Sequence, residues 1–182
     1  IMNNRKIIAQ SFRNGPFSVK EALKKGISKY QLELLLTSGV VEKLTRGIYH
    51  IAREDFDEEN QFRIATLLCG YPSSVCLISA LCYYLLTDTF EGKTWMLVPQ
   101  GKRVSSLSLR LYRSRNPQWN IGIIKNKGYW ITSIERTLVD CLIHKKIVGS
   151  FIAISALKEA LKQKKTTSEL LFNIAVTMKV DL

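Results

Sequence analysis

Few residues in this chain have the types and spacing that catalysis requires. The sequence contains no G-x-S-x-G, H-E-x-x-H or G-x-x-x-x-G-K-[ST] motif, which are signatures of a serine nucleophile, a catalytic zinc site and a phosphate-binding loop. Asp88 and Glu91, close to Lys93, resemble a nuclease-like acidic cluster, but this stretch also has the composition of an ordinary polar loop. We therefore expect no enzymatic activity and no cofactor.

A second group of charged residues, Glu135, Arg136 and Asp140, is interpreted as structural. Thr132 and Glu135 have the spacing of a capping box, in which both residues satisfy backbone groups at a helix start. Arg136 and Asp140 are four residues apart and so share one face of the predicted helix, where they can pair.

The cysteines and histidines give no metal-binding pattern. No C-x-x-C pair is present, and the two histidines are far apart in sequence, which disfavours a zinc site. We expect these side chains to be structural: Cys69, Cys76, Cys82, Cys141 and His50.

The charge of the chain favours a polyanionic partner. The net charge is +12, and it is unevenly distributed. Residues 1–53 hold ten lysines and arginines and three acidic residues, and residues 100–182 hold fifteen and five. Residues 54–99 hold two basic and seven acidic residues, so an acidic segment separates two basic ones.

Lys29 and Gln31 are the side chains best suited to reading DNA bases. Glutamine can pair with an adenine edge through two hydrogen bonds, and lysine can reach guanine or a phosphate. Gln31 has an equally good structural explanation, because Ser28 and Gln31 have capping-box spacing. Tyr30 lies between the two candidates.

Arg46 lies in a predicted turn beside Lys43 and Thr45, where it can enter a minor groove or hold a phosphate. The alternative is a solvated turn arginine. Lys20 lies in the first turn of a predicted helix, where the helix dipole disfavours a cation, and a bound phosphate would remove that conflict. The candidate DNA-contacting residues are Lys20, Ser28, Lys29, Tyr30, Gln31, Lys43, Thr45 and Arg46.

A possible second basic surface lies among later strand-like segments that also carry aromatic residues. Its members are Arg113, Arg115, Lys125 and Lys127. A solvated sheet edge protected by charge explains them equally well.

The candidate DNA-contacting residues lie in a segment whose pattern predicts three helices and a hairpin. A helix is predicted over residues 3–13, capping boxes open two more helices at Ser18 and Ser28, and Gly26-Ile27 forms a tight turn between them. Two β-prone runs, residues 40–44 and 48–51, flank a turn that contains glycine. This order predicts a winged helix-turn-helix domain over residues 1–53.

Residues 54–182 are predicted to form a small α+β domain. Helical patterns cover residues 58–69, 73–86, 132–145, 150–163 and 168–179. Strand-like runs occur at residues 94–98, 107–112, 121–124 and 128–131, so we expect a short-stranded, mainly antiparallel sheet followed by C-terminal helices. No apolar run reaches the roughly 18 residues of a membrane span. The first residues lack a secretion signal, so we expect a cytoplasmic protein without a membrane partner.

Four segments, taken in order, resemble the AbiEi antitoxin family, the regulator half of type IV toxin–antitoxin pairs from bacterial phage-defence loci. They are Leu44-Thr-Arg-Gly-Ile-Tyr49, Ser79-Ala-Leu81, Trp95-Met-Leu-Val-Pro99 and Ile131-Thr-Ser-Ile-Glu-Arg-Thr-Leu-Val-Asp140. Two positions depart from the family pattern: Cys76-Leu77 replaces a Ser-His pair, and Ile134 replaces the usual proline.

The resemblance implies a winged helix that binds operator repeats in double-stranded DNA and represses its own operon. It also implies a C-terminal domain that counters a toxin resembling a nucleotidyltransferase. Two alternatives remain open: a nuclease-like enzyme that a winged helix targets to nucleic acid, and an adaptor whose winged helix binds protein.

Overall fold

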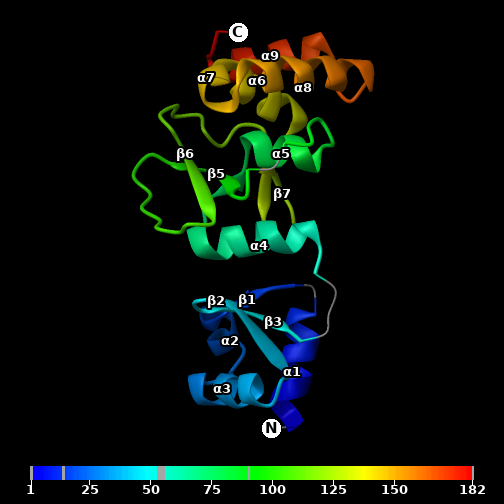
Figure 1. Cartoon of the computed structure of the whole chain (residues 1–182). Helices are drawn as coiled ribbons and strands as arrows, with labels where there is room; N and C mark the ends of the chain where they lie inside the picture. Colours follow the sequence, from blue (N-terminus) through cyan, green and yellow to red (C-terminus); the bar gives the residue numbers. More distant parts are fainter. Residues whose placement is uncertain (1, 14, 53–55, 90, 182) are drawn as a thin grey trace. The chain divides into compact units, whose positions relative to one another are not determined.

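The chain forms an α+β structure with two compact units, as the sequence predicted for its fold class (Figure 1). The computed structural model describes residues 2–13, 15–52, 56–89 and 91–181. Unit 1 comprises residues 1–67 and unit 2 residues 68–182. The domain boundary predicted between residues 53 and 54 lies outside the described residues, and the contacts group the first part of the next helix with unit 1.

The described residues of unit 1 form four helices and a small antiparallel sheet. In chain order its elements are α1 (Met2–Phe12), β1 (Phe17–Ser18), α2 (Val19–Lys24), α3 (Lys29–Thr37), β2 (Val41–Thr45), β3 (Ile48–Ile51) and most of α4 (Glu58–Cys69). The strands lie in the order β1-β3-β2 and pair antiparallel. Strand β1 was not predicted, because two residues directly before a helix carry no periodic pattern.

The core of unit 1 is an apolar cluster to which every element before α4 contributes. It comprises Ile8, Phe17, Ala22, Ile27, Leu32, Leu35, Val41 and Tyr49. Phe17 is completely buried and stacks on Phe12, with ring centroids 4.2 Å apart. These contacts fix α2 and α3 against the β2–β3 hairpin.

Unit 2 contains a five-stranded sheet and five helices among its described residues. In chain order its elements are β4 (Ser74–Val75), α5 (Leu77–Tyr83), β5 (Thr94–Pro99), β6 (Leu109–Ser114), β7 (Ile123–Lys125), β8 (Trp130–Thr132), α6 (Ile134–Ile143), α7 (Lys145–Val148), α8 (Ser150–Lys162) and α9 (Ser168–Met178). Figure 1 shows α6 to α9 gathered beyond one end of the strands. The predicted C-terminal helices are therefore confirmed.

The sheet of unit 2 is mixed, whereas the sequence predicted a mainly antiparallel one. Its order is β6-β5-β4-β8-β7. The β5–β6 and β4–β8 pairs are parallel, and the β4–β5 and β7–β8 pairs are antiparallel. Its central strand β4 is only two residues long and occupies the start of a segment predicted to be helical. A short apolar run does not indicate which strand it pairs with, so the strand pairing could not be predicted from the sequence.

The predicted cap of α6 was wrong by one residue. Ser133 is the N-cap, and its side chain accepts a hydrogen bond from the Arg136 backbone N–H. The Thr132 hydroxyl is instead within 2.7 Å of the Thr137 hydroxyl, inside the core. Glu135 accepts a hydrogen bond from the Thr166 hydroxyl rather than completing a capping box. Thr132 and Glu135 therefore bond to other side chains, Thr137 and Thr166, and not to the backbone groups at the helix start.

Candidate nucleic-acid interface

Helices α2 and α3 are joined by a tight turn, and each begins with a complete capping box. Ser18 and Glu21 close the first box, and Ser28 and Gln31 close the second. Gly26 adopts a φ of +81°, which glycine reaches without strain, and Ile27 is 1% exposed. The buried isoleucine anchors the turn, so α3 leaves it in one direction.

The first turn of α3 presents polar side chains to solvent. Ser28 and Lys29 are exposed, and Tyr30 is 73% exposed, an unusual degree for a large aromatic side chain. Leu32 and Leu35 are buried and hold the opposite face of the helix in the core. The N-terminal turn of the helix is therefore exposed to solvent, while its apolar side fixes its orientation.

Gln31 has the structural role that its spacing predicted. Its side-chain oxygen accepts a hydrogen bond from the Ser28 backbone N–H at 2.8 Å, and the Ser28 hydroxyl accepts one from the Gln31 backbone N–H at 3.2 Å. The capping function of Gln31 is confirmed. Its proposed contact with an adenine remains a prediction.

The β2–β3 hairpin carries the other N-terminal candidates. Lys43 pairs with Tyr49 across the hairpin, and a register shift follows before Thr45. Arg46 is exposed in the turn, next to Gly47 with a φ of +77°. The Gly47 carbonyl accepts a hydrogen bond from the Val19 backbone N–H at 3.0 Å. This bond places the hairpin turn beside the start of α2, which carries Lys20.

Six exposed cations lie on α2, α3 and the hairpin. They are Lys20, Lys24, Lys25, Lys29, Lys43 and Arg46. None of them forms an ion pair with a carboxylate in the part of the chain that the structure describes. Lys24 and Lys25 were not among the sequence candidates, although their place directly before the Gly26 turn could have indicated them. The charge of this region is therefore available to an anion.

Helix α4 is tied to unit 1 through an arginine. Arg63 forms an ion pair with Glu21, and its Nε donates to the Pro16 carbonyl at 3.1 Å. The other carboxylate oxygen of Glu21 accepts from the Ser18 backbone N–H at 2.9 Å. Glu21 thus caps α2 and holds it against α4, which stiffens the support of the exposed turn.

The structure does not bring the four residues of the possible second basic surface together. Arg113 lies on β6 and Arg115 just beyond it, whereas Lys125 lies on β7 and Lys127 just beyond that strand. Strands β6 and β7 are the opposite edges of the five-stranded sheet, and four strand spacings of about 4.8 Å separate them. The pattern fits the alternative of charged sheet edges.

Three of the groups considered for catalysis, Glu91, Arg136 and Asp140, have structural partners. Glu91 accepts hydrogen bonds from the Trp95 indole at 3.0 Å and from Arg110 at 2.8 Å. Arg136 and Asp140 form the predicted pair, 2.8 Å apart and almost completely buried. Within the described ranges, no three His, Cys, Asp or Glu residues are grouped as a metal site would require.

The cysteine thiols are shielded from solvent to different degrees. Cys69, Cys76 and Cys141 are buried, Cys82 is half-buried, and all four are free. Burial raises the pKa of the Cys69 thiol to about 11 and that of Cys76 well above its ordinary value. These two thiols remain protonated near neutral pH, which makes them poor nucleophiles.

The comparison with known families gives a match for the N-terminal segment. Residues 6–52 match the family model described as transcriptional regulator, AbiEi antitoxin. The resemblance predicted from the sequence is thereby confirmed for these residues. The AbiEi segment contains α2, α3, the β2–β3 hairpin and all eight candidate DNA-contacting residues. No curated protein matches the chain.

The N-terminal segment is thus similar to a family of transcriptional regulators described as AbiEi antitoxins. Among the described residues, no helix has the length and apolar character needed to cross a membrane.

Proposed function

We propose that α2, α3 and the β2–β3 hairpin form a winged helix-turn-helix that binds double-stranded DNA. The observation that carries this proposal is the capped first turn of α3, which exposes Lys29 and Tyr30 next to a tight interhelical turn. In a helix-turn-helix, the N-terminal residues of the second helix meet base edges in the major groove. The match of residues 6–52 to a family of transcriptional regulators supports the same conclusion.

The two parts of the proposed interface have different tasks. Lys29 and Tyr30, at the start of α3, contact bases, and sequence preference comes from them. Arg46 and Lys43 on the hairpin, which acts as the wing, contact phosphates and hold the protein in register. Lys20 adds a phosphate contact beside the wing turn.

The test is fluorescence anisotropy of the full chain on a duplex from its own promoter and on a scrambled duplex, each at several salt concentrations. Lys29→Ala should weaken promoter binding more than scrambled binding, since a good base contact discriminates by about 1–3 kcal/mol. Arg46→Ala should weaken both and lower the slope of log affinity against log salt by about 0.9.

Lys158→Ala is the matched control, because it removes the same charge from an exposed position on α8 of unit 2. It should leave both affinities unchanged. If Lys29→Ala and Arg46→Ala also leave both affinities unchanged, the interface is wrong, and an adaptor that binds protein becomes the better explanation.

We further propose that the chain represses its own operon and acts as the antitoxin of a nucleotidyltransferase-like toxin, with no catalytic role of its own. This rests on the resemblance of four segments, one of which includes Arg136 and Asp140, and on the structural engagement of Glu91. In cells whose growth is arrested by expression of the toxin gene, co-expression of this chain should restore growth. Cleavage of DNA or RNA by the purified chain that stops when EDTA is added would overturn the non-enzymatic assignment.

A further inference from the structure

Unit 2 contains a cavity of about 390 Å³ that none of the functions proposed above uses. It lies between the end of β6 with its following loop, helix α6 and the end of α9. Its lining comprises Tyr112, Arg113, Ser114, Arg115, Asn116, Arg136, Asp140, Ile143, His144, Met178 and Val180. The volume falls in the range of about 300–1,000 Å³ that is typical of small-molecule sites.

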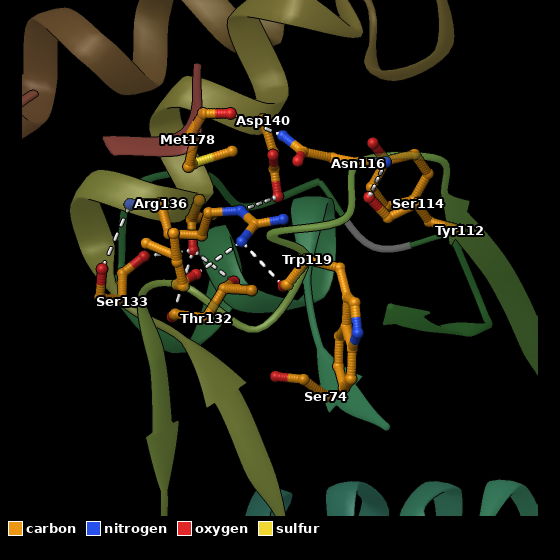
Figure 2. Close-up of polar contacts among 12 residues, drawn as sticks. Ser74, Tyr112, Ser114, Asn116, Trp119, Thr132, Ser133, Arg136, Asp140 and Met178 are labelled. Carbon is orange, nitrogen blue, oxygen red and sulfur yellow. Dashed lines mark hydrogen bonds and ion pairs between the residues drawn. The ribbon is translucent and has the colours of Figure 1, made fainter. Parts of the chain in front are cut away.

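Two buried charged side chains contribute to this lining (Figure 2). The side chains of Arg136 and Asp140 are 1% and 3% exposed, and Arg136 Nε donates to Asp140 Oδ2 at 2.8 Å. Arg136 Nη1 donates to the carbonyls of Trp119 and Ile121 at 2.9 and 2.5 Å. These bonds hold the guanidinium in one orientation.

Each of the two side chains keeps one atom without a hydrogen bond. Arg136 Nη2 and Asp140 Oδ1 have no partner among the described residues, and Nη2 carries no dashed line in Figure 2. Neither atom is among the completely buried polar atoms that lack a partner in the described residues, so both are accessible and open to a hydrogen bond from solvent or a ligand. The ion pair thus offers one donor, Arg136 Nη2, and one acceptor, Asp140 Oδ1, with no net charge.

The remaining lining divides into an apolar part and a cationic part. Ile143, Met178 and Val180 supply apolar surface. Arg113 and Arg115 are exposed, so they lie at the opening and bring positive charge to it.

His144 adds no charge to the buried part of the cavity. Burial, and secondarily the nearby Arg136, lower the pKa of His144, so the imidazole is neutral near pH 7. Its Nε2 is 2.5 Å from the Tyr112 hydroxyl, which occupies that atom. An anionic group is therefore favoured at the opening rather than beside Asp140.

We propose that this cavity binds a nucleoside monophosphate. The edge of the base, which carries a hydrogen-bond donor next to an acceptor, meets Asp140 and Arg136. The base and sugar lie against the apolar side chains, and the phosphate meets Arg113 and Arg115 at the opening. The inference concerns unit 2 alone and does not depend on DNA binding by unit 1.

The test is isothermal titration calorimetry of the full chain with uridine 5′-monophosphate, adenosine 5′-monophosphate, uridine and inorganic phosphate. A monophosphate should bind, and the nucleoside or phosphate alone should bind about tenfold more weakly or worse, because each lacks one set of contacts. Absence of binding by both monophosphates at millimolar concentration would overturn the proposal.

Two variants locate the site. Val180→Trp places a larger side chain in the cavity from a half-buried position and leaves the residues of the ion pair unchanged, and it should abolish binding. Arg113→Ala with Arg115→Ala should weaken binding of the monophosphates about tenfold or more. The matched control, Lys125→Ala with Lys127→Ala, removes two exposed charges from the opposite sheet edge and should leave binding unchanged. Circular dichroism verifies that each variant is folded.

Equal loss of affinity in the arginine and lysine pairs would show non-specific attraction and contradict the proposal. A short 5′-phosphorylated oligonucleotide is titrated in parallel. If it alone binds, and Val180→Trp abolishes that binding, the site takes a strand end and the assignment to a free nucleotide is wrong.

Discussion

At the scale of single residues, Gln31 serves the fold at a position proposed to face DNA. Its side-chain oxygen satisfies the Ser28 backbone N–H, one of the groups that a helix start leaves without an internal partner. A loss of DNA affinity in Gln31→Ala would therefore be ambiguous, because that change also removes half of the capping box. Lys29 and Tyr30 have no such double role in the described hydrogen bonds.

We predict that Gln31→Ala lowers the free energy of unfolding by about 0.5–1 kcal/mol, the net value of an ordinary hydrogen bond. Gln31→Glu should retain most of that stability, because a carboxylate accepts the same bond and suits a helix N-terminus. Urea denaturation of the two variants and the parent measures both effects. Equal destabilisation by alanine and glutamate would show that the box contributes nothing.

His144 provides a prediction on pH. Because burial lowers its pKa below the ordinary value of 6.5, the unfolded chain binds a proton first as the pH falls below 6.5. Stability that is present above 6.5 is therefore lost at lower pH, until the folded state also titrates. His144→Gln removes this dependence.

The stability difference between the parent and His144→Gln should accordingly shift against the parent as the pH is lowered from about 7.5 to about 5.5. Urea denaturation at each pH measures it, and groups whose pKa is the same in both proteins cancel in the difference. A difference that is constant with pH would contradict the assigned pKa direction.

At the scale of elements, the turn before β7 is packed more closely than any side chain allows. Gly122 adopts a φ of +67°, and a Cβ there would lie 2.7 Å from Ile174 Cδ1 and 2.8 Å from Arg136 Cβ. The Gly122 carbonyl also accepts a hydrogen bond from the Ser133 backbone N–H at 2.7 Å. This glycine lets the turn lie directly against α6 and α9.

We predict that Gly122→Ala destabilises unit 2 by roughly 2–4 kcal/mol, from the left-handed conformation and from overpacking. Gly92→Ala separates the two causes, since Gly92 has a φ of +70° but nothing within 4 Å of the added Cβ. It should cost about 1 kcal/mol. Thermal or urea unfolding followed by the tryptophans of unit 2 gives both values, and equal effects would rule out the steric contribution.

At the scale of the whole molecule, the contacts divide the chain within α4 rather than before it. Unit 1 ends at Leu67, and Arg63 of α4 binds both Glu21 and the Pro16 carbonyl. A fragment that stops at residue 53 lacks these partners of α2. The support of the proposed DNA-binding helices thus extends beyond the winged-helix segment predicted from the sequence.

We predict that a fragment of residues 1–67 binds promoter DNA, whereas a fragment of residues 1–53 is less stable by about 1–2 kcal/mol and binds more weakly. Circular dichroism during thermal unfolding and anisotropy on the promoter duplex measure the two properties. The complementary fragment of residues 68–182 should not bind the promoter. If it binds as tightly as the full chain, the DNA interface is not in unit 1.

The sequence by itself determined those features that depend on neighbouring residues. The boxes at Ser18 and Ser28 involve partners three residues away, and the i, i+4 pair of Arg136 and Asp140 needs only a helix. Such interactions have few competitors, so spacing predicts them. The resemblance carried by residues 44–49 was equally local, and the family match confirmed it.

Tertiary structure decided the features whose partners are far apart in the chain. The Thr132 hydroxyl donates a hydrogen bond to the Val75 carbonyl inside the core, and Ser133 rather than Thr132 caps the helix. Likewise, β4 lies between β5 and β8 because buried backbone groups must be paired, and no pattern in two residues can specify that position. The cavity that joins Tyr112 to Val180 exists only after β6, α6 and α9 have packed. Its polar groups belong to segments that sequence spacing cannot relate, and long-range packing alone brings them together.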